Sequence, residues 1–238
     1  MAFLVFAAMP SLGAGQVPSP PLPRPNPSAQ TEQEGVAEPE SHPFGEETEP
    51  EPADEEALAE CEAELRKLGG TFERLPLIDG EGACGMAAPY RLDAVGRGVR
   101  LEPASQVTCE TALAFARWVN KVVVPASDVL GVDTRLSAVL HGSTYICRKR
   151  NNQAAGKISE HAFGTAIDIL SFEFDGRDPI TVVPRTGDGN LKESFQRAVR
   201  GGACLYFTTV LGPGSDEFHN NHLHLDILQR RRGYRLCQ

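Results

Sequence analysis

The stretch "SEHAFGTAIDILSFEF", residues 159–174, is rich in apolar and β-branched residues from Gly164 onwards and predicts a strand. Side chains alternate along a strand, so Ile167 and Ile169 point to one face and Asp168 points to the other. An ionised carboxylate in so apolar a strand is costly unless it is paired or binds a metal. The stretch therefore predicts a core strand that carries a functional carboxylate.

A second stretch, "HLHLDIL" (222–228), alternates in the same way. It predicts a strand with His222, His224 and Asp226 on one face and its leucines and Ile227 toward the core. If the two strands are neighbours, three nitrogen and oxygen ligands can converge, from His161, Asp168 and His224. Zinc takes such ligands, and a catalytic zinc keeps a fourth position open for water. His222 and His219 would then remain for proton transfer.

Other stretches fill in the fold class. Helices are expected at 53–69, at 105–126 with its end at Pro125, and at 190–207, where the helix stops around Gly201 and Gly202. Further strands are expected at 135–145 and 180–184, and residues 82–92 are expected to form a glycine-rich turn region. Helices that precede and interrupt an antiparallel-looking sheet predict an α+β fold, with a small antiparallel sheet that carries the zinc site.

The N-terminal part differs in composition. Residues 1–16 combine an apolar run with small residues and resemble the end of a secretory signal, although a basic start is missing. A disordered apolar end is the alternative. Residues 17–53 hold ten of the 18 prolines and read as a disordered linker before a domain at 54–238. No basic cluster with interleaved aromatic residues suggests nucleic acid. No segment is long enough to span a membrane, beyond a possible N-terminal signal or anchor.

Charge and cysteine content suggest the compartment. Residues 32–66 hold fourteen of the 32 acids, so residues 67–238 carry 18 acids against 21 bases and are mildly basic. The six cysteines are dispersed, with no CxxC pair, and predict up to three disulfides in an oxidising compartment. Fifteen pairings are possible, and six free thiols in a cytosolic protein are the alternative. We expect an exported protein, in the periplasm or cell envelope.

These motifs resemble the superfamily of lysostaphin-type peptidases, D-alanyl-D-alanine metallopeptidases and the hedgehog fold, whose pattern is His-x6-Asp followed by HxH. The resemblance implies Zn²⁺ on His161, Asp168 and His224. "CGMAAPYRL", "LEPASQVTCETALAFARWV" and "STYICR" make residues from about Cys61 to Cys237 resemble the bacterial extensin-like C-terminal domain.

Two departures from the carboxypeptidase pattern matter. The general base of that branch lies three positions before the last zinc histidine, and here Asn221 occupies this position. The HxxHxH spacing resembles the penicillin-insensitive murein endopeptidases, which makes His222 the candidate base, His219 an assistant and Glu217 a reserve. The branch also uses an arginine to hold substrate. Arg148 is the nearest match, in a shifted register, and it is favoured over Arg150. His141 is expected to be structural, and His42 lies in the linker.

Three functions follow as hypotheses. The first is an exported zinc peptidase or amidase that cleaves peptidoglycan peptides through a zinc-activated water. The second is a non-catalytic zinc-containing module that binds wall peptides or a protein partner, which Asn221 favours. The third is a disulfide-rich structural protein whose histidines only pack, with no metal and with His161 far from His224.

Overall fold

The computed structural model describes residues 53–153 and 156–238. The signal-like segment, and all of the expected linker except Ala53, lie outside the described residues. Over the two described ranges, no helix is both long enough and apolar enough to cross a bilayer.

Two of the four α-helices begin and end where their sequences predict. α1 spans Glu55–Lys67, and the carboxylate of Asp54 caps it by accepting from the backbone N–H groups of Glu56 and Ala57. α4 spans Leu191–Ala203 and is capped in the same way by the Asn190 side chain. α4 ends at Ala203, next to the glycines at 201 and 202 around which it was expected to stop.

The middle helix begins and ends later than expected and contains a wider turn. α2 spans Cys109–Trp118, a π-helical turn spans Val119–Val123, and α3 spans Val124–Asp128. The prediction that the helix ends at Pro125 is wrong. The Val124 N–H bonds back five residues to the Val119 carbonyl, and Pro125 lies in the first turn of α3. Its missing N–H costs little at such a position.

One mixed sheet of nine strands organises the domain. Its order is β1-β4-β5-β6-β7-β10-β9-β11, and β8 pairs with β7. The strands are β1 Thr71–Arg74, β4 Tyr90–Val95, β5 Val99–Glu102, β6 Arg135–Ser143, β7 Ala166–Asp175, β8 Ile180–Thr181, β9 Thr209–Leu211, β10 Leu223–Asp226 and β11 Leu236–Cys237. β2 (Ile78–Asp79) and β3 (Gly85–Met86) form a separate pair within the expected turn region and beside it.

The α+β class is therefore confirmed, but the sheet differs from the one expected. It is larger, because β1, β4, β5, β9 and β11 were not anticipated. It is also not purely antiparallel, since β5 pairs with β6 and β9 pairs with β11 in parallel. β7 and β10 lie side by side near its centre and pair antiparallel, as the metal-site hypothesis required.

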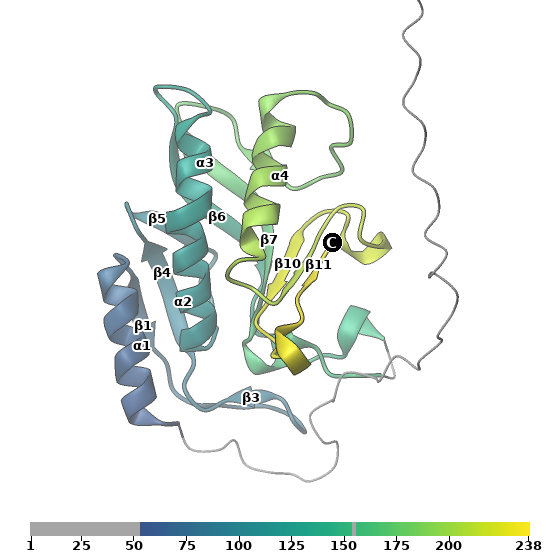
Figure 1. Cartoon of the computed structure of the whole chain (residues 1–238). Helices are drawn as coiled ribbons and strands as arrows, with labels where there is room; N and C mark the ends of the chain where they lie inside the picture. Colours follow the sequence, from purple (N-terminus) through teal and green to yellow (C-terminus); the bar gives the residue numbers. More distant parts are fainter. Residues whose placement is uncertain (1–52, 154–155) are drawn as a thin grey trace, which may run out of the picture. The chain divides into compact units, whose positions relative to one another are not determined.

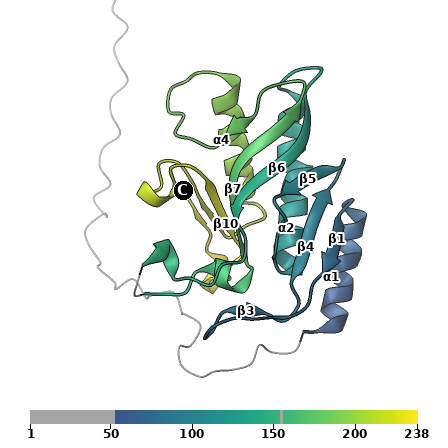
Figure 2. The ribbon, with the colours of Figure 1, turned by 180° about the vertical axis from the view of Figure 1, so that it is seen from behind.

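Helices α2, α3 and α4 lie on one face of the sheet, and the view from behind shows the strands in front of them (Figures 1 and 2). The core between these layers surrounds Trp118, whose ring meets those of Phe115, Phe172 and Phe207 edge-on. The strands contribute apolar side chains to this core, among them Ile167, Ile169, Leu223 and Leu225. By alternation, the neighbouring side chains of β7 and β10 point to the other face, which these helices do not cover.

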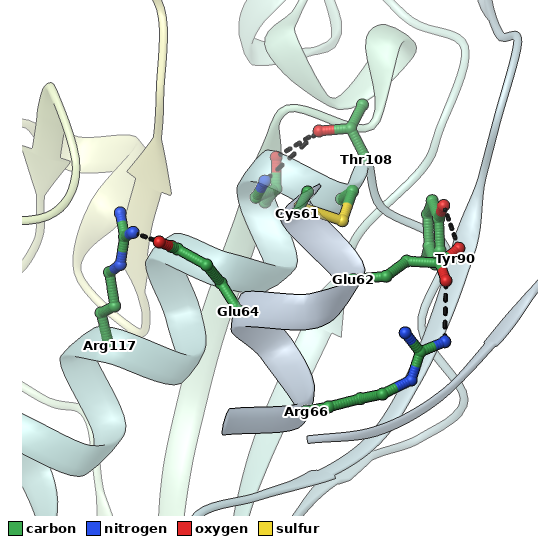
Figure 3. The surroundings of a disulfide bond; sticks show 9 residues. Cys61, Glu62, Glu64, Arg66, Tyr90, Thr108 and Arg117 are labelled. Carbon is green, nitrogen blue, oxygen red and sulfur yellow. Dashed lines mark hydrogen bonds and ion pairs between the residues drawn. A yellow bond between two sulfur atoms is a disulfide. The ribbon is translucent and has the colours of Figure 1, made fainter. Parts of the chain in front are cut away.

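Three disulfides, Cys61–Cys109, Cys84–Cys147 and Cys204–Cys237, select one of the fifteen possible pairings. The first joins α1 to the start of α2, as Figure 3 shows. Beside it, Glu64 pairs with Arg117 of α2, and Glu62 accepts a hydrogen bond from Tyr90 of β4 at 2.9 Å (Figure 3). α1 is thus held by one covalent bond and by polar contacts to both layers.

Phe172 packs between Trp118 and Phe195, at ring-centroid distances of 6.0 and 5.1 Å, and is fully buried. Phe172→Ala should therefore lower the free energy of unfolding by about 4 kcal/mol. Urea denaturation measures the change, because the single tryptophan of the chain lies in this core and its fluorescence reports unfolding. Phe218→Ala is the matched control, since Phe218 is 46% exposed, and should cost less than about 1 kcal/mol. Equal losses would contradict this account of the core.

Candidate metal centre

The two central strands bring the predicted ligands together. Asp168 of β7 and His224 of β10 are directly opposite each other in the pairing register. His161 lies in a 3₁₀ turn, η3 (Glu160–Phe163), that immediately precedes β7. Gly164 ends this turn in the left-handed conformation, with φ of 66°. The reversal at Gly164 lets the chain place His161 beside the strand that carries Asp168.

The three side chains approach one another closely. His161 Nε2 is 3.1 Å from Asp168 Oδ2 and 3.3 Å from His224 Nδ1. His224 Nδ1 is 2.9 Å from Asp168 Oδ1. These are the three residues of the described chain whose ligand atoms cluster as a metal site requires. His161 is fully buried, and Asp168 is 8% exposed.

The remaining nitrogens of both imidazoles are held by acceptors. His161 Nδ1 donates to the Thr144 carbonyl oxygen at 2.6 Å, and His224 Nε2 donates to Asp226 Oδ2 at 3.1 Å. Such outer hydrogen bonds fix the ring orientation and the tautomer of metal-binding histidines. They direct His161 Nε2 and His224 Nδ1 toward Asp168. Ser143 adds a hydrogen bond to Asp168 Oδ2 at 2.8 Å.

Charge is concentrated in this cluster. Burial raises the pKa of Asp168, but hydrogen bonds from His161 and His224 outweigh burial and hold that pKa well below its usual range. Burial lowers the pKa of His224, but hydrogen bonds to Asp168 and Asp226 outweigh it and raise the pKa to about 9. Two carboxylates and two converging nitrogens thus favour a cation among them, which is a proton on His224 when no metal is bound.

The donor set fits zinc. Tetrahedral zinc with bonds of about 2.05 Å to nitrogen separates its ligand atoms by about 3.3 Å. The two nitrogens here are 3.3 Å apart, and the carboxylate oxygens lie at 2.9 and 3.1 Å from them. Three neutral or anionic ligands would leave a fourth position toward the pocket. His161, Asp168 and His224 are therefore the residues that would hold a zinc ion.

Both candidate proton carriers lie beside this cluster. His222 Nε2 is 3.5 Å from Asp168 Oδ1, while its Nδ1 donates to Asn221 Oδ1 at 2.9 Å. His219 donates from Nδ1 to Asp216 Oδ1 at 2.7 Å, and its ring centroid is 5.2 Å from that of His222. Burial lowers the pKa of His222, so its neutral form is favoured. A neutral imidazole can accept a proton.

A pocket of about 300 Å³ opens over the cluster, and both candidate substrate-binding arginines line it. Arg148 has a side chain 24% exposed, and its nearest carboxylate oxygen is Asp168 Oδ2 at 3.9 Å. Arg150 is instead paired with Glu160 at 3.3 Å. Glu217 is exposed and is not part of the pocket lining, so the loop does not bring this reserve base to the cluster.

Other residues around the site were given no role from sequence. Asp226 was expected on the same strand face as His224, and this shared face already indicated that the two side chains could be in contact. Thr144, Ser143, Thr209 and Arg230 were not recognised, because they reach the site through strand pairing with β6 and β9. His141 bonds the Pro103 carbonyl at 2.8 Å outside the pocket lining, and His42 lies outside the described residues.

The fold and this cluster define an α+β, disulfide-bonded protein with a histidine–carboxylate centre on the face of the sheet opposite α2, α3 and α4. The family model for the C-terminus of extensin-like proteins matches residues 59–238. The chain therefore belongs to the extensin-like C-terminal family. Searches of curated proteins and of solved structures gave no significant match. The three disulfides are consistent with an exported protein.

The turn at Gly164 should tolerate no side chain. A Cβ there would lie 1.9 Å from Met86 Sδ, on a backbone with φ of +66°. Gly164→Ala should lower the free energy of unfolding by about 3 kcal/mol, from backbone strain and overpacking together. In Gly82→Ala, φ is +64° but no atom lies within 4 Å of the new Cβ, so about 1 kcal/mol is expected. Urea titrations compare the two, and equal costs would contradict the close approach of Met86.

Proposed function

We propose that this chain is an exported, zinc-dependent peptidase or amidase that acts on peptidoglycan peptides. The observation that carries the proposal is the convergence of His161 Nε2, Asp168 and His224 Nδ1, with the outer nitrogens of both rings hydrogen-bonded. The relation to D-alanyl-D-alanine and lysostaphin-type metallopeptidases rests on the motifs His-x6-Asp and HxxHxH. When bound, zinc would lower the pKa of a water molecule and polarise a substrate carbonyl.

His222 would accept and return the proton. Its Nδ1–H is donated to Asn221, so the lone pair of its Nε2 is available on the side of Asp168. Asn221 cannot itself take a proton, and here it would position the base instead of acting as one. His219, oriented by Asp216, would support His222 from the neighbouring position.

Arg148 would bind a carboxylate of the substrate. Its guanidinium lines the pocket, and its nearest described carboxylate is Asp168 at 3.9 Å, longer than a strong ion-pair hydrogen bond. A substrate carboxylate would therefore gain donors that the protein does not use. Peptidoglycan peptides end in a carboxylate and are reached by exported proteins, which agrees with the disulfides and with the mildly basic residues 67–238.

A non-catalytic zinc module that binds wall peptides is the second candidate. It is favoured by Asn221, which replaces the acidic general base of the carboxypeptidase branch. The two candidates share the metal and the pocket and differ only in turnover. Cleavage therefore separates them, and metal binding tests both together.

Metal binding is expected at one zinc per chain. The full oxidised chain should contain or take up about one equivalent, measured by elemental analysis, and His224→Ala should lose it. Asp226→Asn weakens only the outer hydrogen bond to His224, so zinc affinity should fall about 10–100-fold. A competing chelator measures this change, and circular dichroism verifies that each variant is folded. No uptake by the folded wild-type chain would overturn both candidates.

Turnover is expected to depend on His222. The zinc-loaded chain should cleave purified peptidoglycan peptides, followed by mass spectrometry, and His222→Gln should lower kcat about 10²–10⁴-fold with its zinc retained. Asn220→Ala is the control, since Asn220 is exposed and its amide contacts only the Glu217 carbonyl. Zinc binding without cleavage of any amide bond by the wild-type chain would select the non-catalytic module.

A further inference from the structure

Arg230 lines the same pocket as the metal cluster, yet neither the motifs nor the proposed mechanism gives it a role. It follows β10 in the chain and is partly buried. Its guanidinium donates to the Thr208 carbonyl at 3.0 Å and to Thr209 Oγ1 at 2.6 Å. Both acceptors are neutral, and among the described residues no carboxylate lies within ion-pairing distance of Arg230.

This situation differs from that of the other pocket arginines. Arg150 is neutralised by Glu160, and Arg148 faces Asp168. The four carboxylates of the pocket wall, Asp168, Asp226, Asp216 and Glu160, are bonded to histidines or, for Glu160, to Arg150 and Thr165. A guanidinium has five N–H donors, and two of those on Arg230 are used. Arg230 therefore presents an oriented positive charge to the pocket without a protein anion to receive it.

The position of Arg230 relative to Arg148 follows from the sheet. Asp168 lies near Arg148 and pairs with His224 of β10. Thr209 accepts a hydrogen bond from Arg230 and pairs with Asp226, two residues further along β10. With strands about 4.8 Å apart and about 3.4 Å per residue, the Cα atoms of Asp168 and Thr209 are about 12 Å apart. β10, which carries His224 and Asp226, lies between the two strands that carry Asp168 and Thr209.

We infer that Arg230 is a second anion-binding residue of the pocket, which binds a carboxylate about three residues from the one at Arg148. An extended peptide covers about 3.4 Å per residue, so the span of about 12 Å between Asp168, near Arg148, and Thr209, which holds Arg230, corresponds to three or four residues. The ligand class is a short peptide with a terminal carboxylate and a second, acidic group on the N-terminal side of the bond over the metal. This inference rests on the proposed function for the placement of the peptide, and it adds the second recognition point.

Binding, measured apart from turnover, tests the inference. The probes are the peptidoglycan pentapeptide L-alanyl-γ-D-glutamyl-diaminopimelyl-D-alanyl-D-alanine and the same peptide with the glutamyl α-carboxylate amidated. The His222→Gln change, which should keep zinc and slow cleavage about 10²–10⁴-fold, is present in every chain compared. Titration calorimetry on this zinc-loaded full chain should give an affinity about tenfold weaker for the amidated peptide, because a charge-assisted hydrogen bond is lost. Arg230→Gln should bind both peptides with the same weaker affinity, and Arg230→Lys should keep part of the preference.

Arg235→Gln is the matched control. Arg235 also donates to neutral backbone oxygens, those of Cys204 and Phe207, but it is exposed and outside the pocket lining, so its loss should leave the tenfold preference intact. Thermal unfolding of each variant separates a loss of recognition from a loss of structure. Equal affinity of the chain with Arg230 for the two peptides, no binding of either one, or an undiminished preference after Arg230→Gln would overturn the inference.

The same experiment keeps this inference apart from the proposed function. Cleavage of both peptides with equal affinity would leave the hydrolase intact and remove the second anion site. A preference that depends on Arg230, without cleavage, would retain the second site and favour the non-catalytic module.

Discussion

The cross-strand pairing of Asp168 with His224 is the constraint on which the rest of the site depends. A shift of one residue in β10 against β7 would turn His224 toward the helices and leave Asp168 without its partner. The register is held from the other face, where Ile167, Ile169 and the leucines of β10 are buried against α2 and α4. Each such side chain stabilises the fold by about 1.5–3 kcal/mol when it is fully buried. The geometry of the polar cluster is therefore set by apolar packing on the opposite side of the same strands.

The cluster combines a burial penalty with compensating hydrogen bonds. Asp168 and Asp226 are nearly buried carboxylates, and burial acts against the charge on each. Hydrogen bonds from the histidines outweigh burial and lower the pKa of both carboxyls, and two imidazole nitrogens face the Asp168 carboxylate. An apolar cluster of similar volume would stabilise such a position at least as well. Stability alone therefore does not account for this cluster of charges beneath a pocket.

The predictable parts of the structure are those whose signal is local. α1, α4, β6, β7 and β10 follow from caps, periodicity or alternation, whereas the pairing of β7 with β10 entered only as the condition of the metal-site hypothesis. The strands β4 and β5 were missed because they are short and border glycine-rich turns. Each has only two or three buried residues, which is too few for a recognisable alternating pattern. Disulfide pairing, and the contacts of Thr209 and Arg230, depend on which distant strands become neighbours. No pattern within a single stretch encodes that.

Two of the disulfides lie close in the chain or in the sheet to residues that hold the pocket arginines. Cys84–Cys147 fixes the segment just before Arg148, and Cys204–Cys237 joins the end of α4 to β11. β11 pairs with β9, whose Thr209, with the neighbouring Thr208, holds Arg230. Arg148 and Arg230 are thus each supported by a nearby disulfide, and disulfides persist in an oxidising environment. Under reducing conditions Asp168 and His224 would keep their support from the core. Arg148 and Arg230 would each lose the nearby disulfide. The histidine–carboxylate cluster and the two pocket arginines therefore differ in what stabilises them.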